Sequence, residues 1–352
     1  MTSEGSWVEL GDLHDVAERV LVAVGMPLEH AGWTAGAMVW ADRHGRPAHG
    51  VAGKLGQCVR RIRAGGTTAR PHLRVLQDLG AAVSVDADAA WGQVAGVYAM
   101  RTALACASAY GVGAVSVRNT SSAAAMGYYA WLAAEAGAVG VALTNGPPLV
   151  APPGGGTRML SNQGHAVASP GRDGVHLLHD SALTMISTGR MEALEAEGTP
   201  LPEGVARDAT GAPTRDPGAW RSGVLETIGG AKGFGLAVAF EALTGLLSGG
   251  ERFGPEVGHP GDHGAQQSVS LFCLAVDPRV AGGDADLPAR LEHLRDAVHA
   301  SASGAASTRL PGEERQRLAR ETSRVMVSPH RLAELRSLAD EAGVDPLPVQ
   351  PA

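Results

Sequence analysis

The chain has 352 residues, 44% hydrophobic and 18% charged, which is the composition of a folded protein with a large core rather than of a disordered one. Its formal net charge is −7 and it has no long basic run, so nucleic acid is not an expected partner. It has no run of 18 apolar residues and no signal-peptide pattern, so we expect a cytoplasmic protein without a membrane span.

The first third of the chain has the apolar spacing of helices. Apolar residues recur at helical intervals from Leu10 to Val24 and stop at Gly25. Further helices are predicted over Glu29–Asp42 and Val51–Arg63. The stretch Ala41–Leu55 between them contains two glycines and a proline besides Gly53, which predicts a break between two helices.

From Leu73 onward the apolar period changes to that of strands. Strands are predicted at Val75–Leu79, Ala82–Asp86, Ala114–Val117, Val139–Thr144, Ala166–Ser169, Val175–His179 and Val269–Val276. Helices are predicted at Gly92–Tyr110, Tyr128–Ala136, Phe234–Leu247, Pro288–Ala302, Glu313–Glu321 and Pro329–Ala342.

This order of helices, a strand-rich middle and helices again is typical of a mixed α/β (α+β) fold. We expect a discontinuous helical domain formed by residues 1–75 with 285–352, and a sheet domain formed by residues 76–284. No strand–GxGxxG–helix unit and no GxxxxGK[ST] loop is present, so neither common phosphate motif is available. The three cysteines, Cys58, Cys106 and Cys273, are far apart in apolar surroundings, so we expect buried reduced thiols and no metal site.

Four stretches could carry chemistry. The first is the Ala41–Leu55 break, which holds His49 on a loop among basic side chains, although a plain exposed basic loop has the same pattern. The second, Arg118–Tyr129, is a run of small and hydroxyl residues that enters a helix and suits a phosphate, or is simply a capped helix. The third, Thr144–Gly156, is rich in Pro and Gly, which suits either a rigid connector or a frame for a flat ligand such as nicotinamide. The fourth, Gly229–Leu236, would allow a close approach by a ligand or a neighbouring chain, or serves tight backbone packing.

Asp180 follows a predicted strand. A carboxylate that met His49 would orient the imidazole and stabilise its protonated form, whereas a solvent-exposed turn aspartate has the same sequence context.

Taken in order, ADRHGRPAHGV, VRNTSSAAAMGYYA, ALTNGPPLVAPPGGG and GGAKGFGLAVAFEALTGLLSGG resemble blocks of the malate/L-lactate dehydrogenase family, also called L-sulfolactate dehydrogenase-like. The stretch Gly211–Pro217 is also family-like, and the likeness runs from about residue 8 to about residue 345. The family includes ureidoglycolate dehydrogenases and Δ1-piperideine-2-carboxylate reductases.

This resemblance implies an NAD(P)-dependent oxidoreductase with a cofactor domain that is not a Rossmann fold. It implies NADPH or NADH as the cofactor, with NADPH slightly favoured, and a homodimer with the active site near the subunit interface. The partner would be a small molecule. In the family a histidine donates a proton as hydride arrives at the neighbouring carbon, and an aspartate and a serine form its relay.

Carried over by position, His49 matches the proton donor and Asp180 the relay aspartate. Ala48 stands where the relay serine is expected, and Gly53 stands where an arginine would bind the substrate carboxylate. Substrate-binding candidates are therefore Lys54, Arg46, His44 and Thr184. Cofactor-binding candidates are Ser121, Ser122, Ala123, Ala124, Ala125, Met126, Thr144, Asn145, Pro147, Gln163, Lys232 and Gly233.

Because the polar positions of the site have changed while the scaffold is kept, a plain 2-oxo acid is not the expected substrate. We expect a reductase or dehydrogenase of a small imine, keto or hydroxy substrate, in a specialised biosynthetic pathway. Two other functions stay open: non-redox chemistry on the same scaffold, and a catalytically silent dimeric binding protein.

Overall fold

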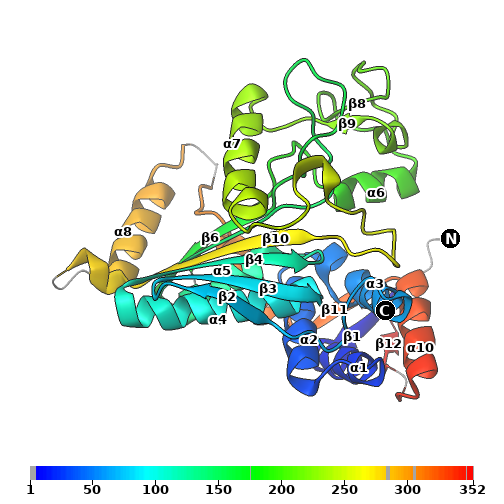
Figure 1. Cartoon of the computed structure of the whole chain (residues 1–352), viewed down its shortest axis with the longest axis horizontal. Coiled ribbons are helices and arrows are strands. Elements are labelled where there is room, and N and C mark those ends of the chain that lie inside the picture. Colours follow the sequence, from blue (N-terminus) through cyan, green and yellow to red (C-terminus); the bar gives the residue numbers. More distant parts are fainter. Residues whose placement is uncertain (1–4, 175, 283–285, 304–306, 346, 352) are drawn as a thin grey trace.

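A computed structural model of the chain describes residues 5–174, 176–282, 286–303, 307–345 and 347–351. At its centre is a seven-stranded sheet with the order β2-β3-β4-β10-β5-β6-β7 (Figure 1). Its strands are β2 (Arg74–Asp78), β3 (Ala82–Ala90), β4 (Val112–Thr120), β5 (Val139–Thr144), β6 (His165–Ser169), β7 (Leu177–Ser181) and β10 (Val269–Val276). Within this sheet β3 and β4 pair in parallel, and the other neighbours pair antiparallel. This is a mixed sheet rather than the parallel, doubly wound sheet of a Rossmann fold, so the predicted fold class is confirmed.

Helices lie on both sides of the sheet (Figure 1). On one side are α4 (Gly92–Tyr110) and α5 (Met126–Glu135), which contact β4 and β5 respectively. On the other side are α7 (Ala231–Glu241), a π turn (Ala242–Leu246), α6 (Thr188–Glu197) and the short pair β8 (Ala206–Arg207) and β9 (Val224–Leu225).

The two ends of the chain meet beside one end of the sheet. There α1 (Leu10–Ala23) and α3 (Val51–Ala64) both contact α10 (Pro329–Ala342), while α2 (Leu28–Arg43) contacts α4. A small sheet with the order β11-β1-β12 joins β1 (Ser6–Glu9), β11 (Arg324–Val327) and β12 (Gln350–Pro351). Two C-terminal helices lie elsewhere: α8 (Leu287–Ala300) contacts the turn Arg172–Gly174, and α9 (Glu313–Glu321) begins beside β7.

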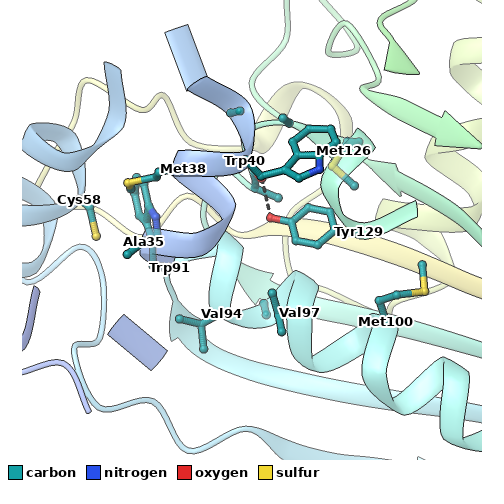
Figure 2. Close-up of a cluster of buried hydrophobic side chains, with 14 of the residues drawn as sticks. Ala35, Met38, Trp40, Cys58, Trp91, Val94, Val97, Met100, Met126 and Tyr129 are labelled. Atoms are coloured by element: carbon teal, nitrogen blue, oxygen red, sulfur yellow. Dashed lines mark hydrogen bonds between the residues drawn. The ribbon is translucent and has the colours of Figure 1, made fainter. Parts of the chain in front are cut away.

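The main core fills the space where α2 meets α4 and α5 (Figure 2). Met38, Trp91 and Val94 are buried there, and the buried Tyr129 donates a hydrogen bond from its hydroxyl to the Ala123 carbonyl at 2.6 Å. The chain has only four Phe and four Tyr, so Ala and Val side chains fill most of this core. Small side chains let the layers approach closely: a Cβ on Gly96 would lie 2.5 Å from the Tyr129 ring.

The predicted elements differ from the structure mainly where they are short. The strand predicted at Val175–His179 is shifted, since β7 begins at Leu177 and continues through Asp180, and Val175 lies outside the described residues. The helix predicted at Phe234–Leu247 begins at Ala231 and ends as a π turn. Helix α6 and the strands β1, β8, β9, β11 and β12 were not predicted. The strands have only two to four residues and are defined by their tertiary partners, whereas α6 has local signals in its N-cap Ser187 and its left-handed C-cap Gly198. The proposed domain boundary at 284/285 also lies outside the described residues.

Candidate active site

A cavity of about 1280 Å³ lies between the helical end and the sheet. Its walls come from segments far apart in the sequence: the loop between α2 and α3, the residues before α5, the loop after β5, strand β7, and the start of α6. This volume exceeds that of a pocket for a single drug-sized ligand, which is about 300–1,000 Å³. The cavity therefore has room for a dinucleotide together with a small substrate.

The loop that carries His49 is fixed by a buried carboxylate. Asp42, in the last turn of α2, accepts a hydrogen bond from the backbone N–H of Val51 at 2.8 Å and so caps α3 from outside that helix. A Cβ at position 50 would lie 1.8 Å from Asp42 Oδ1, so only glycine allows this approach. Burial raises the pKa of Asp42 to about 7, and the hydrogen bond from Val51 opposes that rise.

His49 lies at the end of a 3₁₀ turn (Pro47–His49) and lines the cavity. Its Nδ1 atom is buried and has no hydrogen-bond partner among the described residues. Burial lowers the pKa of His49 to about 3, and the positive charges of Lys54 and Arg46 lower it as well. The imidazole is therefore neutral at neutral pH in the free protein.

Asp180 contacts Arg46 rather than His49. The Asp180 carboxylate lies 3.0 Å from the Arg46 guanidinium, which also donates to the Asp180 carbonyl at 2.8 Å. Burial raises the pKa of Asp180, whereas Arg46 and the backbone N–H of Gly127 at the start of α5 oppose the rise. No hydrogen bond or ion pair joins His49 to Asp180 among the residues that the structure describes.

Two replaced positions of the loop pack against one another. A Cβ on Gly53 would lie 2.4 Å from the Pro47 carbonyl oxygen and 2.7 Å from that of Ala48. The 3₁₀ turn thus occupies the space that a side chain at position 53 would need. Position 53 therefore lacks the family's arginine, and the neighbouring turn leaves no room for an arginine side chain there.

The four residues proposed to bind substrate all line the cavity, and each of them already has a partner within the protein. Arg46 is paired with Asp180, and the hydroxyl of Thr184 donates to the Ile186 carbonyl at 2.8 Å. Lys54 Nζ donates to Gln57 Oε1 at 3.0 Å. Burial lowers the pKa of Lys54, while the nearby carboxylate of Glu192 opposes that shift.

The fourth, His44, stacks on Trp40 with ring centroids 4.0 Å apart, and its Nδ1 is 2.8 Å from the Trp40 carbonyl. Burial lowers the pKa of His44 to about 4, and neighbouring arginines contribute to the shift. It is therefore neutral at neutral pH.

The small-residue stretch before α5 borders the cavity from Ser122 to Met126. The backbone N–H of Ser122 is bonded to Gln267 Oε1, but those of Ala123, Ala124 and Ala125 make no hydrogen bond to the described residues. Ala124 has a positive φ of 60°, which a small side chain tolerates better than a bulky one. Unbonded N–H groups at a helix start suit a phosphate.

The loop after β5 is held from behind by a buried carboxylate. Thr144, Asn145 and Pro147 line the cavity. Glu241 accepts hydrogen bonds from Asn145 Nδ2 at 3.1 Å, from Gln163 Nε2 at 2.7 Å, and from the Gly254 N–H at 2.9 Å. Glu241 thereby ties three loops together.

Four of the predicted cofactor-binding residues are not among those that line the cavity. The Ser121 hydroxyl instead accepts from the Gly92 N–H at 3.1 Å, at the start of α4. Gln163 is fully buried against Glu241, Lys232 is exposed on α7, and Gly233 packs on the Ile228 carbonyl. Their side chains serve packing and capping or face solvent.

Sequence reasoning missed many of the residues that line the cavity, and two of them carry charge near the proposed substrate end. Glu192 comes from α6, which was not predicted, and Arg315 comes from α9, which is about 265 residues from His49 along the chain. Local pattern can locate the helices α6 and α9, but only the packing of distant segments brings these two side chains to the cavity.

Further expectations concern metals, thiols and membranes. Among the described residues no group of three or more His, Cys, Asp or Glu side chains is arranged to hold a metal ion. Cys58 and Cys273 are buried free thiols, as expected, whereas Cys106 is only partly buried. Within the described ranges no helix combines the length and the apolar character that crossing a bilayer requires.

Comparison with known proteins gives consistent matches over most of the chain. The family model described as malate/L-lactate dehydrogenase matches residues 8–336. A malate dehydrogenase of Pyrococcus abyssi is 36% identical over 247 residues, which cover 68% of each chain. An L-sulfolactate dehydrogenase of Methanocaldococcus jannaschii is 30% identical over 330 residues, covering 93% of this chain and 94% of that one.

Solved structures of the same family have the same fold as this chain. The sulfolactate dehydrogenase of Methanocaldococcus jannaschii superposes with a TM-score of 0.89 at 27% identity, over 96% of this chain and 98% of that one. A Δ1-piperideine-2-carboxylate reductase of Pseudomonas syringae superposes with a TM-score of 0.85 at 27% identity, over 94% and 99%.

Proposed function

Because the chain belongs to the malate/L-lactate dehydrogenase family and is therefore an oxidoreductase, we propose that it transfers a hydride between a nicotinamide dinucleotide and a small imine, keto or hydroxy substrate. The observation that carries this proposal is the shared cavity. Its walls include both His49 and the residues Ala123–Ala125, whose backbone N–H groups make no hydrogen bond to the described residues, around one space of about 1280 Å³. The residues Ala48 and Gly53, which replace a serine and an arginine expected in the family, favour a substrate other than a plain 2-oxo acid.

The residues before α5 fit the phosphates of the nucleotide. Three backbone N–H groups, those of Ala123 to Ala125, make no hydrogen bond to the described residues and are free to donate. The loop Thr144–Pro147 borders the same cavity and is held in place through Glu241. The bound nucleotide would supply the hydride acceptor or donor; these protein segments would only hold and orient it.

His49 is the proposed group for proton transfer. When a hydroxyl substrate is oxidised, its C–H bond breaks as hydride leaves, its O–H bond breaks, and a ring nitrogen of neutral His49 accepts that proton. In the reverse direction the protonated ring returns the proton to the carbonyl oxygen or imine nitrogen. The lowered pKa of His49 in the free protein favours the proton-accepting form. An anionic substrate beside the ring would raise that pKa and make the proton-donating form accessible.

Asp180 is proposed to act on this site together with Arg46. Its carboxylate is held between Arg46 and the start of α5. It thereby compensates one of the two positive charges that lower the pKa of His49. Without the hydroxyl that a serine at position 48 would supply, this electrostatic route takes the place of a hydrogen-bonded relay.

Several further features belong to the same proposal. The family resemblance supports a homodimer with the active site near the subunit interface. The changed positions Ala48 and Gly53 favour a role in a specialised biosynthetic pathway, and the lack of a signal-peptide pattern favours the cytoplasm. NADPH is slightly preferred to NADH as the proposed cofactor.

Nucleotide binding is the decisive test. Purified protein would be titrated with NADH and with NADPH, and the fluorescence of the reduced nucleotide and the melting temperature would be followed. Binding should stabilise the folded state by about 2.7 kcal/mol at a hundredfold excess over Kd. If neither nucleotide binds, the redox function is wrong, and non-redox chemistry or a binding role on the same scaffold takes its place.

A further inference from the structure

The cavity is lined by many positive side chains, and nearly all of them are engaged elsewhere in the protein. Arg46 pairs with Asp180, Arg60 and Arg331 pair with Glu334, Arg221 pairs with Glu195, and Arg190 pairs with Glu197. Arg158 donates to the carbonyls of Trp220, Arg221 and Gly223. Lys54 is bonded to Gln57 and lies near Glu192.

Arg315 is different. Its guanidinium makes no hydrogen bond, ion pair or aromatic contact with the described residues, although it lines the same cavity. An unengaged guanidinium presents its planar set of N–H donors to a ligand, and that geometry matches a carboxylate with two parallel hydrogen bonds.

The first turn of α9, which carries Arg315, is held in place by hydrogen bonds to the segment around β7. The neighbouring Gln316 is buried and bonds both backbone groups of His176, accepting from its N–H at 3.2 Å and donating to its carbonyl at 2.6 Å. The N–H of Leu178 donates to the Pro311 carbonyl at 3.2 Å, and Gly312 packs on Leu178 so closely that a Cβ would lie 2.3 Å from its carbonyl oxygen. The start of α9 is thus fixed on β7, the strand that carries Asp180.

The charge of Arg315 reaches the groups around His49. Burial is the main cause of the low pKa of His44, and Arg315 is one of three arginines that lower it further. At Asp180 burial raises the pKa, and Arg315 opposes the rise together with the nearer Arg46 and Gly127. Arg315 thus lines the same cavity as the Arg46–Asp180 pair, and its charge acts on both residues of that pair.

We propose that Arg315, on α9, determines substrate specificity by binding the carboxylate of the substrate in place of an arginine at position 53. This inference rests on the proposed function, since it concerns the substrate end of the same site. It also changes the expectation for the substrate: a carboxylate-bearing molecule stays possible despite Gly53, but its charged end lies toward α9 and β7.

The test uses oxamate, a small carboxylate, and oxamide, its uncharged analogue, as probes. Each would be titrated by calorimetry into protein saturated with whichever reduced nucleotide binds. The variants are Arg315→Gln, Arg315→Lys and the control Arg317→Gln, which removes an exposed arginine of the same helix that pairs with Glu314.

We expect wild type and Arg317→Gln to bind oxamate at least about tenfold more tightly than oxamide. Arg315→Gln should lose about tenfold or more in oxamate affinity with unchanged affinity for oxamide and for the nucleotide, and Arg315→Lys should retain part of it. Equal oxamate affinity in Arg315→Gln and wild type, no preference for oxamate in wild type, or a loss confined to nucleotide binding would each overturn the proposal.

Failure of the two proposals can be told apart. If no nucleotide binds, the redox function fails, and the oxamate titration on the nucleotide-free protein still reports on Arg315 directly. If the nucleotide binds but the Arg315 variants behave as wild type, only the assignment of Arg315 fails.

Discussion

Arg46 and Asp180 form a largely buried ion pair at 3.0 Å that joins the loop after α2 to strand β7. The side chain of Asp180 is 7% exposed and that of Arg46 is 22% exposed, so water screens this pair far less than it screens a surface pair. The pair fixes the loop of His49 on the sheet and sets the charge around the imidazole.

Removing one partner of this pair should be costly. Arg46→Gln or Asp180→Asn would leave the other charge buried, with an expected loss of about 2–4 kcal/mol in the free energy of unfolding. The double variant should lose less than the sum of the two, which urea unfolding in a double-mutant cycle would measure. Arg60→Gln, which breaks the more exposed pair with Glu334, should cost less than about 1 kcal/mol. Additive losses at Arg46 and Asp180 would show that the two residues are not coupled.

His49→Asn should remove proton transfer but keep the nucleotide. We expect turnover on the best of a panel of 2-hydroxy acids and cyclic imines to fall about 10²–10⁴-fold, because no titratable ring remains at the reacting centre. The Kd of the nucleotide should stay within about twofold of that of wild type. His72→Asn, at an exposed histidine that does not line the cavity, is the control. Full turnover in His49→Asn would exclude His49 as the proton-transfer group.

Asp42 should make stability depend on pH. Its pKa is about 7 in the folded protein and near 3.8 when unfolded, so between these values the folded state binds the extra proton. The contribution of Asp42 to the free energy of unfolding is therefore greatest below about pH 3.8, and it is lost as the pH rises to about 7. A shift of this size corresponds to about 4 kcal/mol.

Comparison with Asp42→Asn isolates this effect from the histidines, which titrate in the same range. The stability of wild type relative to Asp42→Asn should fall between pH 4.5 and pH 8 in urea unfolding experiments, by about 1–4 kcal/mol. Asp340→Asn, at an exposed position of α10, should show no such change. A constant difference between wild type and Asp42→Asn would contradict the raised pKa.

Gly53 should tolerate no side chain. Gly53→Ala places a Cβ against the Pro47 carbonyl and should destabilise the protein by about 1–3 kcal/mol. The matched control is Gly235→Ala in α7, where no atom lies within 4 Å of the added Cβ and a gain of about 0.5–1 kcal/mol is expected. Gly53→Arg should therefore not create a carboxylate clamp, and oxamate affinity should not rise. Higher oxamate affinity in Gly53→Arg would show that the loop moves aside easily.

Glu241→Gln should loosen the loops around the cavity. The carboxylate accepts three hydrogen bonds, and a glutamine would turn an N–H₂ group toward at least one donor, at a cost of about 1–3 kcal/mol. Nucleotide Kd should rise while kcat at saturation changes little, since the loop Thr144–Pro147 is positioned through Asn145. Glu251→Gln, at an exposed residue, is the control. An unchanged nucleotide Kd in Glu241→Gln would show that the hydrogen bonds of Glu241 do not contribute to nucleotide binding.

The sequence by itself determined the long elements and the family. The predictions for α1 to α4 agree with the structure to within about two residues, and in α1 and α3 apolar residues at helical spacing form the buried face. Several ordered blocks such as GGAKGFGL identified the family. The sequence also brought attention to His49 and Asp180, both of which line the cavity.

Only the tertiary structure decided how those residues meet. Asp180 pairs with Arg46 and not with His49, and Gln163 bonds to Glu241. Arg315 reaches the cavity from α9. Each of these arrangements joins segments more than 70 residues apart in the sequence. Local pattern records which face of an element is buried, but a contact between two distant polar side chains depends on where their backbones are placed by the packing of the whole core. Gly53 is the clearest case, since the sequence showed a missing arginine and only the packing of the Pro47–His49 turn showed that no side chain fits there.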